Sequence, residues 1–236
     1  MGERLVATQV SPWLGGLATV LTHDLVLPHW FRSITVEGQE MLPRSGPLVL
    51  APTHRARWDA LLLPYVAGRR VTGRDCRFMV TVDEMQGLQG WVLSRLGCFA
   101  VDQARPSLSS LRHAVELLAG GQQLVLFPEG RIRRHDEKPA RLQQGLGRLV
   151  GLATSRGVSV PVIPVGIAYS HAIPRLCDRV AVCFGRPMHL MGGGRQAAGA
   201  FTADLAVALA EQESHAQASL GQSPVALAGR RAEQSL

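Results

Sequence analysis

Two clusters of polar residues contain the side chains best suited to chemistry. One spans Thr53 to Asp59 (THRARWD) and follows the apolar run 47–52. The other spans Pro128 to Arg134 (PEGRIRR) and follows the apolar run 123–127. Both runs are typical of buried strands, and ligands of open α/β sheets bind beyond the carboxyl ends of strands. We therefore expect the two clusters to meet across one crevice.

The spacing of His54 and Asp59 restricts how these side chains can meet. Five residues on a continuous helix rotate by about 500°, so the two would point apart. They can meet only if His54 lies on a turn and Asp59 in the first turns of the following helix. The carboxylate could then fix the imidazole tautomer and stabilise the imidazolium, while the other ring nitrogen takes a proton from a substrate hydroxyl. The sequence near this pair has no serine or cysteine nucleophile, so the substrate itself would attack.

The other charged residues of the two clusters have plainer explanations. Glu129 could cap a turn or pair with an arginine instead of binding a substrate. Arg133 and Arg134 are expected to be solvated surface charge. Arg55 and Arg57 could contact phosphate, although a solvated helix face explains them equally well.

The elements that must position these clusters follow from hydrophobic periodicity. Apolar runs predict strands over residues 47–52, 76–82, 98–101, 123–127, 158–168 and 180–184. Helical periods and caps predict helices over residues 60–67, 84–96, 107–119, 142–153 and 202–218. This alternation predicts a single α/β domain with a largely parallel mixed sheet flanked by helices.

Residues 12–31 form the most hydrophobic stretch of the chain. Four polar or helix-breaking residues interrupt it: His23, Asp24, Pro28 and His29. A bilayer span needs about 20 consecutive apolar residues, so this stretch does not qualify. Trp13 and Trp30 near its ends favour an amphipathic helical segment lying in the lipid interface. A helix packed on the domain core is the alternative.

Composition limits the partners and cofactors of the protein. Aromatic residues make up only 5% of the chain, which argues against a nucleic-acid partner bound by base stacking. The formal net charge of +7 favours anionic partners such as lipid headgroups, phosphorylated substrates or acidic carrier proteins. The four cysteines form no CxxC pair and have no histidines at zinc spacing, so we expect no metal site.

Three blocks in order make the sequence resemble a known family. They are the His-x-x-x-x-Asp of His54 and Asp59, FPEG at residues 127–130, and VPVIPVGI at residues 160–167. The chain resembles the glycerolipid acyltransferases, a family that includes the PlsC-type lysophosphatidic acid acyltransferases. The resemblance covers roughly residues 30 to 190. A histidine–aspartate spacing alone would be a weak signal, whereas three ordered blocks at predicted strand ends are a strong one.

The resemblance implies transfer of a fatty acyl group to lysophosphatidic acid, which gives phosphatidic acid. The acyl donor would be the thioester of acyl-CoA or of acyl-carrier protein, a co-substrate, and no cofactor is implied. His54 would be the general base and Asp59 its orienting partner. Glu129, Gly130 and Arg131 would bind the acceptor's phosphate. Backbone N–H groups near His54 are candidate donors to the tetrahedral oxyanion.

The chain departs from the family pattern in places that concern the acceptor. The second block normally ends in an arginine, where this chain has Gln103, and Arg105 could substitute for it. Thr53 replaces the usual asparagine before the catalytic histidine. Because of the Gln103 departure, another lysolipid or lipid acceptor stays open, and so does a thioesterase reaction with water. A non-catalytic relative is disfavoured.

Pro161 and Pro164 of the fourth block would lie on the acyl-donor side.

The pattern divides the chain into three expected parts. Residues 1–31 form the N-terminal interfacial helical segment, 32–190 the acyltransferase core, and 191–236 a C-terminal helix with a frayed tail. The first nine residues carry Glu3 and Arg4 and lack the features of a signal peptide. We therefore expect a peripheral or monotopic protein on the cytoplasmic face of a membrane, with the lipid surface as a partner.

Overall fold

The strand β2 (Leu48–Pro52) explains why the central strands are continuous apolar runs. All five of its residues are buried. Leu48 and Leu50 pack into one hydrophobic cluster, whereas Val49 and Ala51 pack into another on the opposite face of the sheet. Successive side chains of a strand point to opposite faces, so a strand covered on both sides must be apolar at every position.

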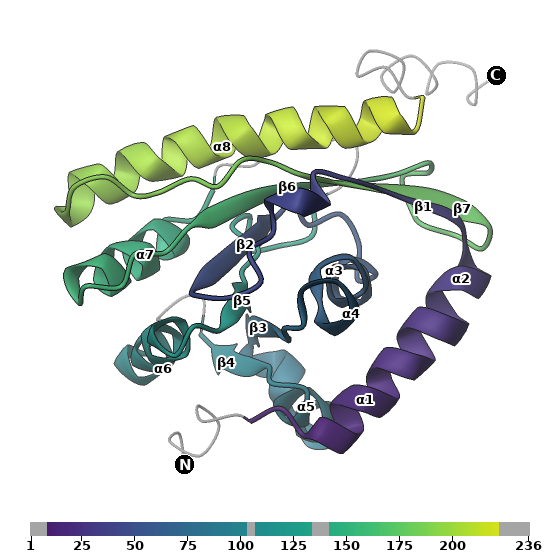
Figure 1. Cartoon of the computed structure of the whole chain (residues 1–236), viewed down its shortest axis with the longest axis horizontal. Coiled ribbons are helices and arrows are strands. Elements are labelled where there is room, and N and C mark those ends of the chain that lie inside the picture. Colours follow the sequence, from purple (N-terminus) through teal and green to yellow (C-terminus); the bar gives the residue numbers. More distant parts are fainter. Residues whose placement is uncertain (1–8, 103–106, 134–141, 222–236) are drawn as a thin grey trace.

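A seven-stranded sheet organises the computed structural model, which describes residues 9–102, 107–133 and 142–221 (Figure 1). The strand order is β1-β7-β6-β2-β5-β3-β4, and only the neighbours β6 and β7 are antiparallel. The remaining strands are β1 (Phe31–Glu37), β3 (Cys76–Thr81), β4 (Phe99–Val101), β5 (Gln123–Val125), β6 (Val162–Tyr169) and β7 (Asp178–Phe184). The predicted α/β domain with a largely parallel mixed sheet is confirmed.

Helices cover both faces of this sheet. One face packs against α2 (Leu27–Trp30) and α3 (Asp59–Ala67), with α4 (Arg69–Thr72) and α5 (Gly87–Arg95) nearby. The other face packs against α6 (Leu108–Ala119), α7 (Gly145–Ser155) and α8 (Gly194–Ser219). Figure 1 shows α7 and α8 on one side of the sheet and α3 and α4 on the other.

Several elements differ from the sequence-based expectation, among them β1, α5 and α8, which begins at Gly194 and not near residue 202. The edge strand β1 was not predicted, because its first residue, Phe31, was assigned to the apolar N-terminal segment. The helix predicted over residues 84–96 is divided into a 3-10 turn, Val82–Met85, and α5. Gly87, the first residue of α5, has φ +56°, a conformation that residues other than glycine rarely adopt.

The N-terminal helical segment runs from Pro12 to Trp30 and turns its apolar side outward. It consists of α1 (Pro12–Val20), a π-helical stretch (Leu21–Val26) and α2. The buried positions of this segment are Gly15, His23 and Leu27, spaced by multiples of four. The exposed large apolar residues are Trp13, Leu17, Val20, Leu21, Leu25 and Val26. Among the described residues, no helix combines the length and hydrophobicity that crossing a bilayer requires.

The long helix α8 approaches β6 closely at a glycine. A Cβ atom built on Gly166 would overlap the backbone of Gln212 in α8. This glycine therefore sets how near the helix can lie to the sheet. Glu213 follows Gln212 in α8, and its carboxylate pairs with Arg55 and Arg133, which lie beyond the carboxyl ends of β2 and β5.

We expect Gly166→Ala to lower the free energy of unfolding by about 1–3 kcal/mol, because α8 would have to move off β6. The matched control is Gly199→Ala in α8, where an added Cβ meets nothing within 4 Å. That change should raise stability by about 0.5–1 kcal/mol through helix propensity. Urea denaturation of the two variants measures both effects, and equal stabilities would contradict the close packing of α8.

Candidate active site

The carboxylate of Asp59 is the centre of the polar cluster after β2. Asp59 is the first residue of α3 and its side chain is 0% exposed. Its Oδ2 accepts from His54 Nδ1 (2.9 Å) and from the backbone N–H groups of Arg55 (2.6 Å) and Ala56 (2.9 Å). Its Oδ1 accepts from the Tyr169 hydroxyl at 2.6 Å. The structure thus brings together the predicted pair, with His54 on the turn before the helix.

This hydrogen bonding determines which nitrogen of His54 can accept a proton. An ionised carboxylate only accepts hydrogen bonds, so Nδ1 carries the imidazole proton and Nε2 keeps its lone pair. The His54 side chain is 19% exposed, which leaves a route for a small group to reach the ring. The arrangement can therefore take a proton at Nε2 and stabilise the resulting imidazolium at Nδ1.

His54 is also held by the second polar cluster and by the sheet. The Phe127 ring stacks on the imidazole with centroids 4.0 Å apart and planes 24° apart. The backbone N–H of Arg133 donates to the His54 carbonyl at 2.8 Å. The Thr53 hydroxyl accepts from the backbone N–H of Ile167 in β6 at 2.9 Å. Both clusters therefore meet at His54, as their positions after strands β2 and β5 predicted.

Tyr169 is a site residue that sequence reasoning missed. It ends β6 and is buried. Burial and the neighbouring Asp59 carboxylate raise the pKa of Tyr169 well above its usual value, so the hydroxyl stays protonated and donates to Asp59. Its position directly after the predicted strand 158–168, at the same end of the sheet as His54, was the signal that could have identified it.

A buried cluster of four charges lies beside the histidine. Arg133 pairs with Glu129 (Nε to Oε2, 3.2 Å) and, through Nη2, with Glu213 of α8. Arg55 also pairs with Glu213 (Nη1 to Oε1, 3.1 Å). None of the four side chains is more than 9% exposed. The prediction that Arg133 is solvated surface charge was wrong, because a carboxylate from a distant helix compensates its burial.

The ionisation of this cluster reflects a balance between burial and pairing. Burial is the largest influence on Glu129 and raises its pKa above the usual value, although the neighbouring Arg133 acts to lower it. Burial alone would lower the pKa of Arg133, but the carboxylates of Glu213 and Glu129 outweigh it and raise that pKa above its usual value. Burial likewise lowers the pKa of Arg55. Two cations and two carboxylates leave the cluster with no net charge.

The turn after β5 separates the predicted phosphate-binding residues. Gly130 adopts φ +71°, and its N–H donates to the Phe127 carbonyl at 3.1 Å. Glu129 therefore points into the buried charge cluster, whereas Arg131 is exposed. Their predicted contacts with phosphate, and that of Gly130, stay predictions. Arg105 and Gln103 lie outside the described residues.

The two prolines assigned to the acyl-donor side belong to the frame of the sheet. Pro164 is buried in β6 and pairs in register with Ala51 of β2. Pro161 immediately precedes β6, and its carbonyl accepts from the N–H of Val49 at 3.0 Å. Because β2 and β6 are parallel, Pro161 lies at the opposite end of the sheet from His54. The donor-side assignment stays a prediction.

The backbone donors expected for an oxyanion are partly occupied. The N–H groups of Arg55 and Ala56 both donate to Asp59, so they hold the carboxylate in place. No group of three or more metal-ligating side chains occurs among the described residues.

Aromatic side chains connect the N-terminal segment to the site. The rings of Trp30 and Trp58 lie with centroids 4.6 Å apart, and Phe31 contacts Trp58 edge-on at 5.4 Å. Trp58 directly precedes Asp59, so the end of the N-terminal helix packs against the start of the helix that holds the carboxylate. These contacts give Trp58 a packing role.

Comparisons with known proteins find a matching family model and a solved structure of similar fold. Residues 33–168, more than half of the chain, match the family model described as Acyltransferase. No curated protein matches the chain. The fold is similar to that in the crystal structure of the 1-acyl-sn-glycerophosphate (LPA) acyltransferase, PlsC, from Thermotoga maritima. The TM-score is 0.59 with 18% identity, and the match covers 86% of this chain and 78% of that chain.

We expect Tyr169→Phe to lower kcat about tenfold with KM little changed, because a hydrogen bond to a buried carboxylate contributes about 1.5–3 kcal/mol. The control is Tyr65→Phe, since Tyr65 is the chain's other tyrosine and packs on His23. Steady-state kinetics of both variants test the contact. An unchanged kcat for Tyr169→Phe would show that the hydroxyl does not support the pair.

Proposed function

This chain belongs to the acyltransferase family, and on that premise we propose that it moves a fatty acyl group from a thioester to the free hydroxyl of lysophosphatidic acid. The observation that carries the proposal is the contact of His54 Nδ1 with the buried Asp59 carboxylate, which leaves Nε2 as a base. Both residues lie within the matched region. The acyl thioester is a co-substrate, and the proposed reaction needs no cofactor.

The proposed reaction uses His54 first as a base and then as an acid. Nε2 takes the proton of the acceptor hydroxyl as its oxygen attacks the thioester carbonyl carbon. Asp59 stabilises the imidazolium that forms. The tetrahedral intermediate then collapses, the carbon–sulfur bond breaks, and the imidazolium returns its proton to the leaving thiolate. The products are the ester and a free thiol, and the histidine ends as it began.

Arg131 is the proposed partner of the acceptor's phosphate. It is exposed at the turn that follows Phe127, whose ring stacks on His54. A guanidinium binds phosphate oxygens through paired hydrogen bonds. Glu129 and Arg133 form part of the buried charge cluster, so we propose that they support this turn from beneath. The acyltransferase of similar fold from Thermotoga maritima is described as acting on 1-acyl-sn-glycerophosphate, which favours this acceptor.

We propose that the enzyme acts at the cytoplasmic face of a membrane. Both the acceptor and its product are lipids. The N-terminal helix exposes Trp13 (74%), Leu25 (52%) and Val20 (48%) along one side. A helix that presents apolar residues to solvent can lie in the lipid interface with that side buried. The net charge of +7 suits anionic headgroups as well as acyl-CoA or acyl-carrier protein, both of which are anionic donors.

Thiol release from an acyl thioester, with lysophosphatidic acid present or absent, tests the proposed reaction. We expect release to require the acceptor and phosphatidic acid to appear. His54→Ala should lower kcat by about 10³-fold, the order expected for losing a general base. Its binding to vesicles should be unchanged. Equal thiol release without acceptor would identify a thioesterase instead, and near-normal activity of His54→Ala would exclude it as the base.

Arg131→Ala should raise KM for lysophosphatidic acid about tenfold or more and leave KM for the thioester unchanged, because only acceptor binding loses a charged contact. Arg57→Ala is the control, since Arg57 is also an exposed arginine of the polar clusters. Initial rates over a range of both substrates separate the two KM values. If only the KM for the thioester changed, Arg131 would not be the residue that binds the acceptor's phosphate.

A further inference from the structure

The connection between β6 and β7 exposes apolar side chains at its tip. Residues 170–177, here called the hairpin tip, include Ile173 at 82% exposure and Leu176 at 60%. Arg175 lies between them and is also exposed. Exposure of two large aliphatic residues within four positions is costly in water, and it is typical of a surface that meets another apolar phase.

The hairpin tip is held in shape from within. The buried carboxylate of Asp178 accepts from His171 Nδ1 at 2.6 Å and from the Ser170 hydroxyl. The N–H of Cys177 donates to the carbonyl of Trp30 at 2.7 Å. The apolar side chains therefore project from a fixed loop, which lowers the entropy cost of placing them in a partner.

This loop is continuous with the end of the N-terminal helix. Trp30 is the last residue of α2, and β1 starts at Phe31, which pairs in parallel with Asp178. The end of the helix and the end of the hairpin tip therefore lie next to each other at one edge of the sheet. Figure 1 shows α2 joining β1 beside the connection that leads into β7.

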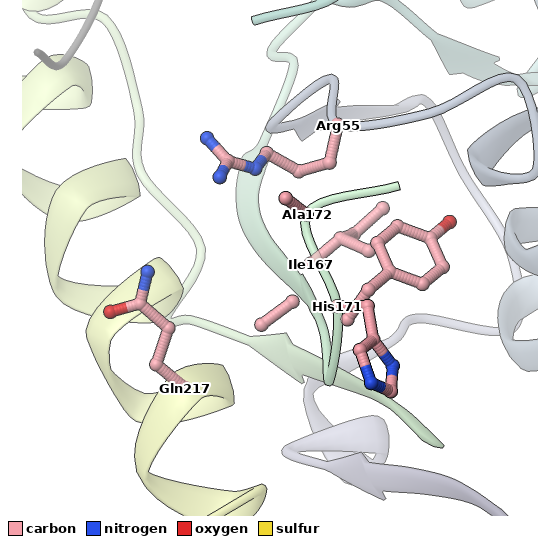
Figure 2. Close-up of a pocket in the computed structure, with 7 residues that line it drawn as sticks. Arg55, Ile167, His171, Ala172 and Gln217 are labelled. Atoms are coloured by element: carbon pink, nitrogen blue, oxygen red, sulfur yellow. The ribbon is translucent and has the colours of Figure 1, made fainter. Parts of the chain in front are cut away.

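The hairpin tip also borders the candidate active site. It begins directly after Tyr169, whose hydroxyl donates to Asp59. His171 and Ala172 line a small pocket together with Arg55, the residue that follows His54 (Figure 2). The tip therefore lies at the end of β6 whose last residue, Tyr169, contacts the carboxylate that binds His54.

The exposed charges around the hairpin tip are positive, which favours contact with an anionic lipid surface. Arg175 and Arg32 are exposed on the tip and on the neighbouring strand β1. The one carboxylate of the tip's base, Asp178, is buried and engaged. Basic residues beside apolar ones bind anionic bilayers, because the guanidinium groups reach headgroups while the aliphatic groups enter the acyl boundary.

We propose that the hairpin tip is a second membrane-contact element, which inserts Ile173 and Leu176 into the headgroup boundary of an anionic bilayer beside the N-terminal helix. The two elements would hold the entrance to the site at the lipid surface. This inference rests on the proposed membrane association of the enzyme and adds a specific second contact to it.

A fluorophore at the tip tests the contact directly. The three cysteines other than Cys177 are buried, so a Cys177→Ser background allows labelling at a single introduced cysteine. Ile173→Cys is labelled with a nitrobenzoxadiazole dye, and Val207→Cys on α8, 69% exposed in the native chain, is the control. With phosphatidylcholine–phosphatidylglycerol vesicles, the dye at 173 should shift to the blue and resist iodide quenching. The dye at 207 should do neither. A dye at 173 that stays accessible to iodide on vesicle-bound protein would overturn the inference.

Vesicle sedimentation separates this inference from the proposal on which it rests. The double variant Ile173→Ser/Leu176→Ser should raise the vesicle dissociation constant about tenfold or more, because two aliphatic groups no longer leave water. Val207→Ser should bind like wild type. If Trp13→Ser/Leu17→Ser weakens binding while the hairpin variant binds normally, the second contact fails and membrane association stands. If the wild-type protein does not bind vesicles, both fail.

Discussion

The fully buried carboxylate of Asp59 is the interaction around which this end of the molecule is built. Burying an ionised carboxylate costs several kcal/mol unless hydrogen bonds replace its water. Here four donors replace it: two backbone N–H groups of the turn, the imidazole of His54 and the hydroxyl of Tyr169. The turn after β2, the start of α3 and the end of β6 must all be in place for these donors to converge. The requirement to satisfy one charge thus positions the base.

A second electrostatic layer supports the first without taking part in its chemistry. Arg55 and Arg133 are buried cations, and Glu129 and Glu213 balance them. Replacing one member would leave an unpaired buried charge, which costs more than the pair contributes. A neutral cluster of this kind stiffens the two loops that flank the histidine.

Features encoded by a residue spacing or a strand pattern were predictable from the sequence, whereas individual side-chain pairings between distant elements were not. The meeting of His54 and Asp59 followed from their spacing on a turn and helix, and the central strands followed from their apolar runs. The edge strand β1 is half exposed and therefore lacks such a run. The burial of Arg133 depends on Glu213, 80 positions away, and no local pattern encodes that pairing. Tyr169 was missed because its role arises only where β6 ends beside β2.

The origin of Glu213 in α8 has a consequence for the order in which the protein can mature. The described elements are made in the order α1 to α8, and this carboxylate is supplied by the last described helix. Before α8 is in place, Arg55 and Arg133 lack the carboxylate of Glu213 with which both pair in the folded protein. A chain without a docked α8 therefore has an incomplete charge cluster beside His54 and Asp59. The buried charge cluster is complete only when α8 docks on the sheet.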